Sequence, residues 1–350
     1  MHIFCGGASW LCSLWLGYDA GSEKWMKRRE FISLLGGAAI ALPLASRAEA
    51  AGVPKVGFLY PGPEVVANER ATHVLEGLRS EGFSAPDRLT LVIRAMGDDQ
   101  TRLQPLLSEI IASKVDILIP VGPPQTRAAH AATTSIPILT FDLEIDPVEA
   151  GLVSSLAHPG GNVTGMFLDF PEFGTTWLGL LKQAIPALAS IVVLWDPSTS
   201  TVQTKAVIAA AQRLGVKVEI LQVKTPAELG AVFEAASAHK PDGLLMLSSP
   251  IMGIYAKQCA DLALAHRLPA ISLFSAFTRA GGLMSYGPDV SDLYREVGVM
   301  AGKVLKGTKP ADLPAERPSR FEMLVNLKTA KALNLDIPDT LLVRASEVIE

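Results

Sequence analysis

The sequence predicts an α/β protein built from two doubly wound lobes, each with a parallel sheet between layers of helices. Two observations support this fold class. Short apolar runs alternate with amphipathic segments along most of the chain, and strands that are apolar on both faces are typical of parallel sheets covered by helices. The second half of the chain also repeats the order of segments found in the first half.

The composition is that of a globular chain with a large core. Of the 350 residues, 49% are hydrophobic and 19% are charged, which excludes a disordered chain. The formal net charge of −4 leaves no basic surplus to neutralise phosphates, so we expect no nucleic-acid partner. The mean hydropathy of +0.30 is high for a soluble protein, and the N-terminal segment partly explains it.

Residues 26–50 have the order of charged, apolar and small residues found in secretory signal peptides. The pair Arg28 and Arg29 resembles a twin-arginine export signal. The apolar run that follows is shorter than the roughly 20 residues that span a membrane, although an uncleaved anchor helix is the alternative. The small residues that end this segment are typical of a signal-peptide cleavage site, so we expect cleavage after about Ala50. We expect the mature protein to lie in the periplasm.

Residues 1–25 fit no part of this leader, and we expect them to be an extension upstream of a true start at Met26. Cys5 and Cys12 lack the upstream leucine of a lipoprotein signal, which disfavours a lipid anchor. Cleavage leaves Cys259 as the single cysteine, so no intrachain disulfide is predicted. Cys259 lies in an Ala/Leu-rich helical pattern, and we expect a small buried hydrophobe there.

Eight apolar runs after the leader are predicted to be buried strands: 56–60, 89–95, 117–121, 136–141, 191–195, 216–221, 244–247 and 270–273. The amphipathic segments among them are predicted to be helices: 69–80, 103–113, 202–214, 227–238 and 254–266. A strand at 283–286, a helix at 289–306 and a strand at 321–326 are predicted to follow.

The two halves match segment by segment. Residues 56–63 (VGFLYPGP) correspond to 192–198 (VVLWDPS), and similar pairs are 115–124 with 241–250 and 135–142 with 267–275. We assign 53–160 plus 285–350 to lobe one and 161–284 to lobe two. The Gly-rich stretch 149–170 is interpreted as a crossing between lobes, and the tail is expected to pack back on lobe one. Such a multi-crossing hinge restricts the lobes to a hinge motion.

Ligands of open parallel sheets bind beyond the carboxyl ends of the strands, so the residues that directly follow the apolar runs form the candidate site. In lobe one these are Tyr60, Pro61, Gly122, Pro123, Pro124, Gln125, Phe141 and Asp142. In lobe two they are Trp195, Asp196, Ser248, Ser249, Phe274 and Ser275.

These residue types suit a small organic ligand. The helix start near Gln125 offers free N–H groups to a carboxylate. Asp142 and Asp196 suit an ammonium group, and the aromatic members of the set suit a planar or apolar group. Each residue alone also fits ordinary turn and cap chemistry, so the prediction concerns the set that lines a cleft between the lobes.

The run that contains Asp142, Glu144 and Asp146 is denser in acid than a turn requires. It indicates either a cationic group on the ligand or a solvated acidic loop. Phosphate-binding, hydrolase and metalloprotease motifs are missing, and the histidines are scattered along the chain. We therefore predict no enzyme, no cofactor and no metal site.

Five segments resemble ABC transporter substrate-binding proteins, in the group with tryptophan/tyrosine-type binding components. They are 26–39 (MKRREFISLLGGAA), 136–172, 280–290, 309–335 and the final LLVRASEVIE. The resemblance covers 26–350 and implies a type 1 periplasmic-binding-protein fold that traps a small ligand between closing lobes. It implies an aromatic amino acid or related aromatic acid as ligand, and an ABC permease and ATPase of the inner membrane as partners. We expect a monomer.

One departure concerns the segment before Asp146-Pro147-Val148. Many members of the family have a shorter Gly-containing stretch where this chain has Phe141-Asp142-Leu143-Glu144-Ile145. That difference changes the wall of the cleft at the expected amine site. Two alternatives remain open at this point: an exported two-lobed enzyme with Asp142 or Asp196 as base, and a ligand sensor that docks a signalling partner.

Overall fold

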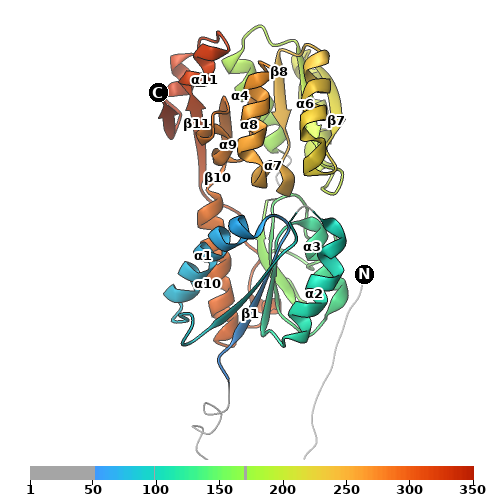
Figure 1. Ribbon diagram of the computed structural model, residues 1–350, viewed down its shortest axis with the longest axis vertical. Coiled ribbons are helices and arrows are strands. Elements are labelled where there is room, and N and C mark those ends of the chain that lie inside the picture. Colours follow the sequence, from blue (N-terminus) through green and yellow to red (C-terminus); the bar gives the residue numbers. More distant parts are fainter. Residues whose placement is uncertain (1–51, 98, 169–171) are drawn as a thin grey trace, which may run out of the picture. The chain divides into compact units, whose positions relative to one another are not determined.

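The computed structural model describes residues 52–97, 99–168 and 172–350, and these residues form two sheets flanked by helices (Figure 1). The expected extension 1–25 and leader 26–50 lie outside the described residues. Within the described part of the chain, none of the helices is both long and apolar enough to cross a membrane.

The first sheet has five parallel strands in the order β2-β1-β3-β4-β5. Its central strands are buried because their apolar residues face helices on both sides. The strands are β1 (Lys55–Tyr60), β2 (Thr90–Ala95), β3 (Ile117–Pro120), β4 (Ile138–Asp142) and β5 (Val163–Phe167). The helices of this lobe are α1 (Glu64–Ser80), α2 (Leu103–Ala112), α3 (Pro123–Ala132) and α10 (Val290–Leu305), with the 3₁₀ turn η2 (Gln100–Arg102).

The second sheet has seven strands in the order β12-β11-β10-β9-β8-β6-β7, and only the β10–β11 pair is antiparallel among its described pairings. The strands are β6 (Ser190–Trp195), β7 (Lys217–Gln222), β8 (Gly243–Met246), β9 (Ala270–Ser272), β10 (Met284–Pro288), β11 (Phe321–Asn326) and β12 (Glu347–Ile349). The helices are α4 (Glu172–Ala184), α5 (Val202–Leu214), α6 (Leu229–Ala238), α7 (Pro250–Ile254), α8 (Ala256–Ala265), α9 (Ser275–Arg279), α11 (Leu327–Ala332) and α12 (Asp339–Leu342), with the 3₁₀ turn η3 (Pro226–Glu228). A further 3₁₀ turn, η4 (Pro310–Asp312), precedes β11.

The predicted internal repeat is confirmed by the strand order. The run β7-β6-β8-β9-β10 in the second sheet has the same connectivity as β2-β1-β3-β4-β5 in the first. All eight predicted strands are present, with ends within two residues of those expected. Cys259 is fully buried on α8, as expected for a small hydrophobe, and burial raises the pKa of its thiol to about 12.

The structure corrects two parts of the predicted lobe boundaries. Residues 163–167, assigned to lobe two, form β5 of the first sheet. Gly165 (φ +143°) permits this pairing, because an added Cβ would lie 2.2 Å from the carbonyl oxygen of Thr140 on β4. Residues 285–350, assigned to lobe one, include most of β10 and all of β11 and β12, which belong to the second sheet. There β11 pairs antiparallel with β10 over five residue pairs, and β12 pairs with β11.

Helix α10 crosses back to the first sheet and packs on α1. The contact is close because Gly77 and Gly298 lie at the crossing: a Cβ on Gly298 would lie 2.1 Å from the carbonyl oxygen of Val74. Among the described elements, the chain therefore changes from one lobe to the other three times: between β5 and α4, between β10 and α10, and between α10 and β11. Such multiple connections favour a hinge motion of the two lobes.

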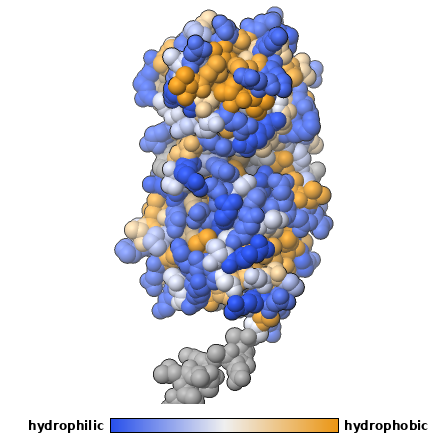
Figure 2. Space-filling view, turned by 90° about the vertical axis from the view of Figure 1, so that its left-hand side faces the viewer, coloured by the Kyte–Doolittle hydropathy of each residue, from blue (hydrophilic) through white to orange (hydrophobic). Residues whose placement is uncertain are grey.

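The surface differs between the two lobes. Figure 2 shows apolar side chains gathered at the top, over the second lobe, while the first lobe in this view is mostly hydrophilic. Val343, directly after α12, is 86% exposed.

Candidate functional site

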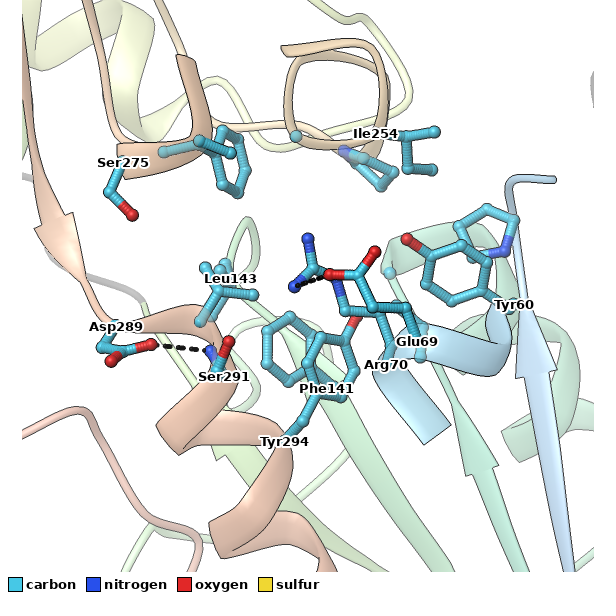
Figure 3. Close-up of a pocket in the computed structure, with 18 of the residues that line it drawn as sticks. Tyr60, Glu69, Arg70, Phe141, Leu143, Ile254, Ser275, Asp289, Ser291 and Tyr294 are labelled. Carbon is cyan, nitrogen blue, oxygen red and sulfur yellow. Dashed lines mark hydrogen bonds and ion pairs between the residues drawn. The ribbon is translucent and has the colours of Figure 1, made fainter. Parts of the chain in front are cut away.

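A cavity of about 460 Å³ lies between the carboxyl ends of the two sheets (Figure 3). This volume is in the range typical of sites for small organic ligands. The first lobe contributes Tyr60, Pro61, Glu69, Arg70, Val121, Gly122, Phe141, Leu143, Glu144, Val290, Ser291 and Tyr294, with Asp289 at the start of α10. The second lobe contributes Pro250, Gly253, Ile254, Phe274, Ser275, Ala276, Arg279 and Ala280.

The structure brings six of the fourteen candidate residues to this cavity: Tyr60, Pro61, Gly122, Phe141, Phe274 and Ser275. A smaller cavity of about 100 Å³ is lined by Pro124, Gln125 and Asp196, together with Pro61 and Lys224. The remaining candidates, which line neither cavity, are Pro123, Asp142, Trp195, Ser248 and Ser249. Ser249 instead caps α7, where its hydroxyl accepts a hydrogen bond from the Met252 amide at 3.2 Å.

Aromatic rings form one wall of the cavity. Phe141, at the end of β4, stacks on Tyr294 of α10 with ring centroids 4.1 Å apart and planes 5° from parallel. Tyr60, the last residue of β1, also lines the cavity (Figure 3), and Phe274 lines it from the second lobe. Burial raises the pKa of Tyr60 to about 12, so its phenol stays neutral and remains a hydrogen-bond donor.

Two arginines reach the cavity from opposite lobes. Arg70 on α1 lies with its guanidinium carbon 5.9 Å from the centre of the Tyr294 ring, and its side chain is 17% exposed. Its ion-pair partner Glu69 is 3.6 Å away and 61% exposed, so water screens that pair. Arg279 on α9 already pairs with Glu347 at 2.9 Å and donates to the hydroxyl of Ser275 at 3.1 Å.

Glu144 is a buried carboxylate in the cavity wall, just after β4. Its Oε1 accepts a hydrogen bond from the hydroxyl of Ser248 at 2.7 Å, and its Oε2 accepts one from the Leu143 amide at 3.2 Å. Burial and then the neighbouring charge of Asp142 raise the pKa of Glu144. Asp142 itself is fully buried, and burial also raises its pKa.

The two lobes touch beside the cavity. Gly62 and Gly122 of the first lobe lie so close to the second that an added Cβ would meet Ile254 at 2.8 Å and Pro250 at 2.9 Å, respectively. Gly122 also has a φ of +89°, which favours glycine. A hydrogen bond of 3.1 Å from Arg127 to the carbonyl oxygen of Ser198 adds a polar contact between the lobes. The two glycines therefore permit the close approach of the lobes in this structure.

Arg70, Tyr294 and Glu144 line the cavity but are not members of the predicted candidate set. Arg70 and Tyr294 lie on helices, and the rule used to choose candidates considers only the ends of strands. Glu144 belongs to the acidic run that the sequence singled out, but the prediction placed Asp142 and not Glu144 in the site. The signal for Glu144 was therefore present, whereas helical periodicity alone does not single out Arg70 or Tyr294.

Most of the chain is similar to known proteins. A family model described as ABC transporter substrate binding protein matches residues 67–349. The chain is also 27% identical over 269 residues to a tyrosine-binding protein of Clostridioides difficile (strain R20291). The aligned part covers 75% of this chain and 75% of that protein.

Solved structures share the fold. An ABC domain from Streptococcus pneumonia in complex with L-Trp is 26% identical, with a TM-score of 0.77 over 85% of this chain and 100% of that one. A ligand-free, open substrate binding protein with adhesive properties from Clostridium difficile is also 26% identical, with a TM-score of 0.60 over 85% and 99%. A conserved domain protein from Vibrio cholerae, 21% identical, has a TM-score of 0.78 over 85% and 100%.

Proposed function

This chain belongs to the family of ABC transporter substrate-binding proteins, and we propose that it traps an aromatic amino acid, or a related aromatic acid, in the cavity between its lobes. The observation that carries this proposal is the stacked pair Phe141–Tyr294 beside the guanidinium of Arg70. Aromatic rings suit the ring of such a ligand, and a guanidinium suits its carboxylate, which it can bind through two hydrogen bonds.

Relatives support the same ligand class. A curated relative is a tyrosine-binding protein, and a solved relative was determined with L-Trp. A cavity of about 460 Å³ accommodates a ligand of this size. Tyr60 and Phe274, which project into the cavity from opposite lobes, would enclose the ring from two sides.

The conformation supports a trapping mechanism. At equal identity, this structure has a higher TM-score to the L-Trp complex (0.77) than to the ligand-free, open relative (0.60). The close approach of Gly62 to Ile254 agrees with a closed form. A ligand that contacts both lobes favours this form by its differential affinity for the closed and open states.

Closure would serve transport. The leader-like segment 26–50 supports export to the periplasm, where a permease of an ABC uptake system would recognise the closed, loaded lobes. An exported enzyme is less well supported, because neither Asp142 nor Asp196, the bases considered for it, lines the main cavity.

A thermal-shift screen of amino acids and aromatic acids tests the proposal. A ligand at 100 times its Kd stabilises the folded state by about 2.7 kcal/mol, so we expect L-tryptophan, L-tyrosine or L-phenylalanine to raise the Tm by several degrees. Aliphatic amino acids of similar charge serve as controls. The proposal fails if natively folded protein gains no stability from any aromatic solute.

A further inference from the structure

Three carboxylates line the main cavity, and two of them already have partners. Glu69 is exposed and pairs with Arg70. Asp289 caps α10 by accepting hydrogen bonds from the amides of Ser291 at 2.9 Å and Asp292 at 3.3 Å. Glu144 differs from both because it is only 7% exposed and its two hydrogen-bond donors, Ser248 and the Leu143 amide, carry no charge.

The charged groups around Glu144 do not compensate it. The charges that act on it most strongly are those of Asp142 and Asp196, and both are acids. The cation of this region, Arg127, acts on Asp142 and donates its hydrogen bond to a backbone carbonyl oxygen. Arg70 and Arg279, also in the cavity, are paired with Glu69 and with Glu347.

A buried carboxylate without a cation is costly in its charged form. It is stable when it holds a proton, or when a cation arrives to pair with it. Burial, and next the charge of Asp142, accordingly raise the pKa of Glu144 to about 8. The ionised carboxylate of Glu144 therefore has no cation to pair with in the cavity as it stands.

We infer that Glu144 makes the cavity selective for a ligand that carries an ammonium group, which takes the place of the carboxyl proton. When the ammonium binds, the proton leaves Glu144 for solvent and the carboxylate pairs with the ligand cation, so charge and protons balance. The inference rests on the proposed function, because it names the group that recognises the amine of an aromatic amino acid in the same cavity.

Ser248 couples the recognition of the ammonium group to the closure of the two lobes. Its hydroxyl lies in the second lobe, after β8, and donates to Glu144 Oε1 of the first lobe at 2.7 Å. The hydrogen bond joins the two lobes, and together with the Leu143 amide it orients the carboxylate in this structure. Ser248 is thus a positioning residue that makes the closed form better suited than the open form to hold an ammonium.

The inference separates two ligands that differ only in the amine. An aromatic amino acid provides the cation, so closure around it does not require a protonated Glu144. Its deamino counterpart provides none, so closure around it requires Glu144 to keep or take up a proton. That contribution is complete at low pH and is lost as the pH rises through the raised pKa of Glu144. The affinity ratio of the two ligands should therefore rise with pH.

Titration calorimetry with L-tryptophan and 3-indolepropionate, and with L-tyrosine and 3-(4-hydroxyphenyl)propionate, tests this from about pH 6 to about pH 8.5. In the wild type we expect the amino-acid to deamino affinity ratio to rise severalfold or more over this range. In Glu144→Gln we expect a loss of at least about tenfold in affinity for the amino acid, little loss for the deamino acid and a ratio independent of pH. Glu234→Gln, which neutralises an exposed carboxylate on α6 outside the cavity, should retain the wild-type affinities and pH dependence.

The outcomes separate the two proposals. If no aromatic ligand binds folded protein, the proposed function itself fails. If the amino acids bind but the wild-type ratio does not change with pH, or Glu144→Gln binds them as the wild type does, the assignment of Glu144 is wrong and the proposed function stands. The wild-type pH series decides the question even if Glu144→Gln does not fold, which circular dichroism would show.

Discussion

Arg70 is the cation best placed to hold the carboxylate of a ligand. It is three-quarters or more buried and lies over the Tyr294 ring, and its ion-pair partner among the described residues is the exposed Glu69. Arg279 is less suited to this role because Glu347 and Ser275 already take up its guanidinium. At the scale of single residues, the account therefore depends on Arg70 for the carboxylate and on the aromatic wall for the ring.

Replacing Arg70 tests this assignment. Arg70→Lys keeps the charge but loses the planar fork that binds a carboxylate through two hydrogen bonds, so we expect affinity for the aromatic amino acid to fall about tenfold or more. Arg70→Ala should lose more. Calorimetry measures both, and Arg88→Ala, which removes an exposed arginine outside the cavity, is the control. Unchanged affinity in Arg70→Ala would exclude Arg70 from the site.

The residue scale also shows how far the sequence predicts the site. The ends of the strands identified Tyr60, Phe141 and Phe274, because a parallel sheet places those ends together. The sequence did not identify Tyr294, since its contact with Phe141 arises from the return of α10 to the first lobe. The choice between Asp142 and Glu144 depended on which side chain the turn after β4 directs into the cavity, and local sequence does not determine that.

Among the elements, the loop after β1 limits how closely the lobes approach. A Cβ on Gly62 would lie 2.8 Å and 3.0 Å from two carbons of Ile254 in the opposite lobe, and 3.1 Å from the Tyr60 ring. Overpacking of this kind costs about 1–3 kcal/mol. Most of that cost arises only when the lobes meet, so it opposes closure more than folding.

Gly62→Ala should therefore lower the affinity for the aromatic amino acid about fivefold or more, while the Tm of unliganded protein changes little. Gly179→Ala on α4 is a matched control, because nothing lies within 4 Å of its added Cβ. It should bind as the wild type does. A Gly62→Ala protein with wild-type affinity would show that closure does not require this approach.

The close packing of α1 against α10 holds the helix that carries Tyr294 into the cavity. A Cβ on Gly77 would lie 2.0 Å from the carbonyl oxygen of Arg295, and Gly298 is similarly close to Val74. These clashes involve backbone atoms, which cannot move aside as a side chain can. The packing of these two helices also holds Tyr294, which α10 carries into the cavity.

Gly298→Ala is expected to destabilise the unliganded protein by about 1–3 kcal/mol or more, because the helices must separate. Calorimetric unfolding should show a Tm about 2 °C or more below that of the wild type. Affinity should fall as well, since Tyr294 moves with the helix. The Gly179→Ala variant again provides the comparison, and equal stability of the two variants would contradict the close packing described for α1 and α10.

At the scale of elements, the sequence predicts where the strands lie but not which sheet each strand joins. Apolar periodicity located eight strands, because burial on both faces leaves a clear pattern. It did not determine which sheet a strand joins. The run 163–167 lies in a Gly-rich stretch and was interpreted as part of a crossing, and the tail strands were assigned to the wrong lobe. Pairing partners distant in the sequence decide both cases.

The whole molecule combines two similar lobes with three connections between them. The repeated strand order places the carboxyl ends of both sheets at the same cavity, so each lobe contributes part of the site. Three connections restrict the lobes to opening and closing. Ser248 donates a hydrogen bond to Glu144, and Gly62 lies against Ile254. Both contacts join the two lobes beside the cavity, so ligand binding there is coupled to the opening and closing of the lobes.

Titration of the purified protein with L-tryptophan and L-tyrosine by calorimetry at two temperatures tests the central claim most directly. We predict saturable binding of one ligand per chain and a negative heat-capacity change, because an aromatic ring is buried between the lobes. The absence of saturable binding of any aromatic amino acid to folded protein would contradict the account.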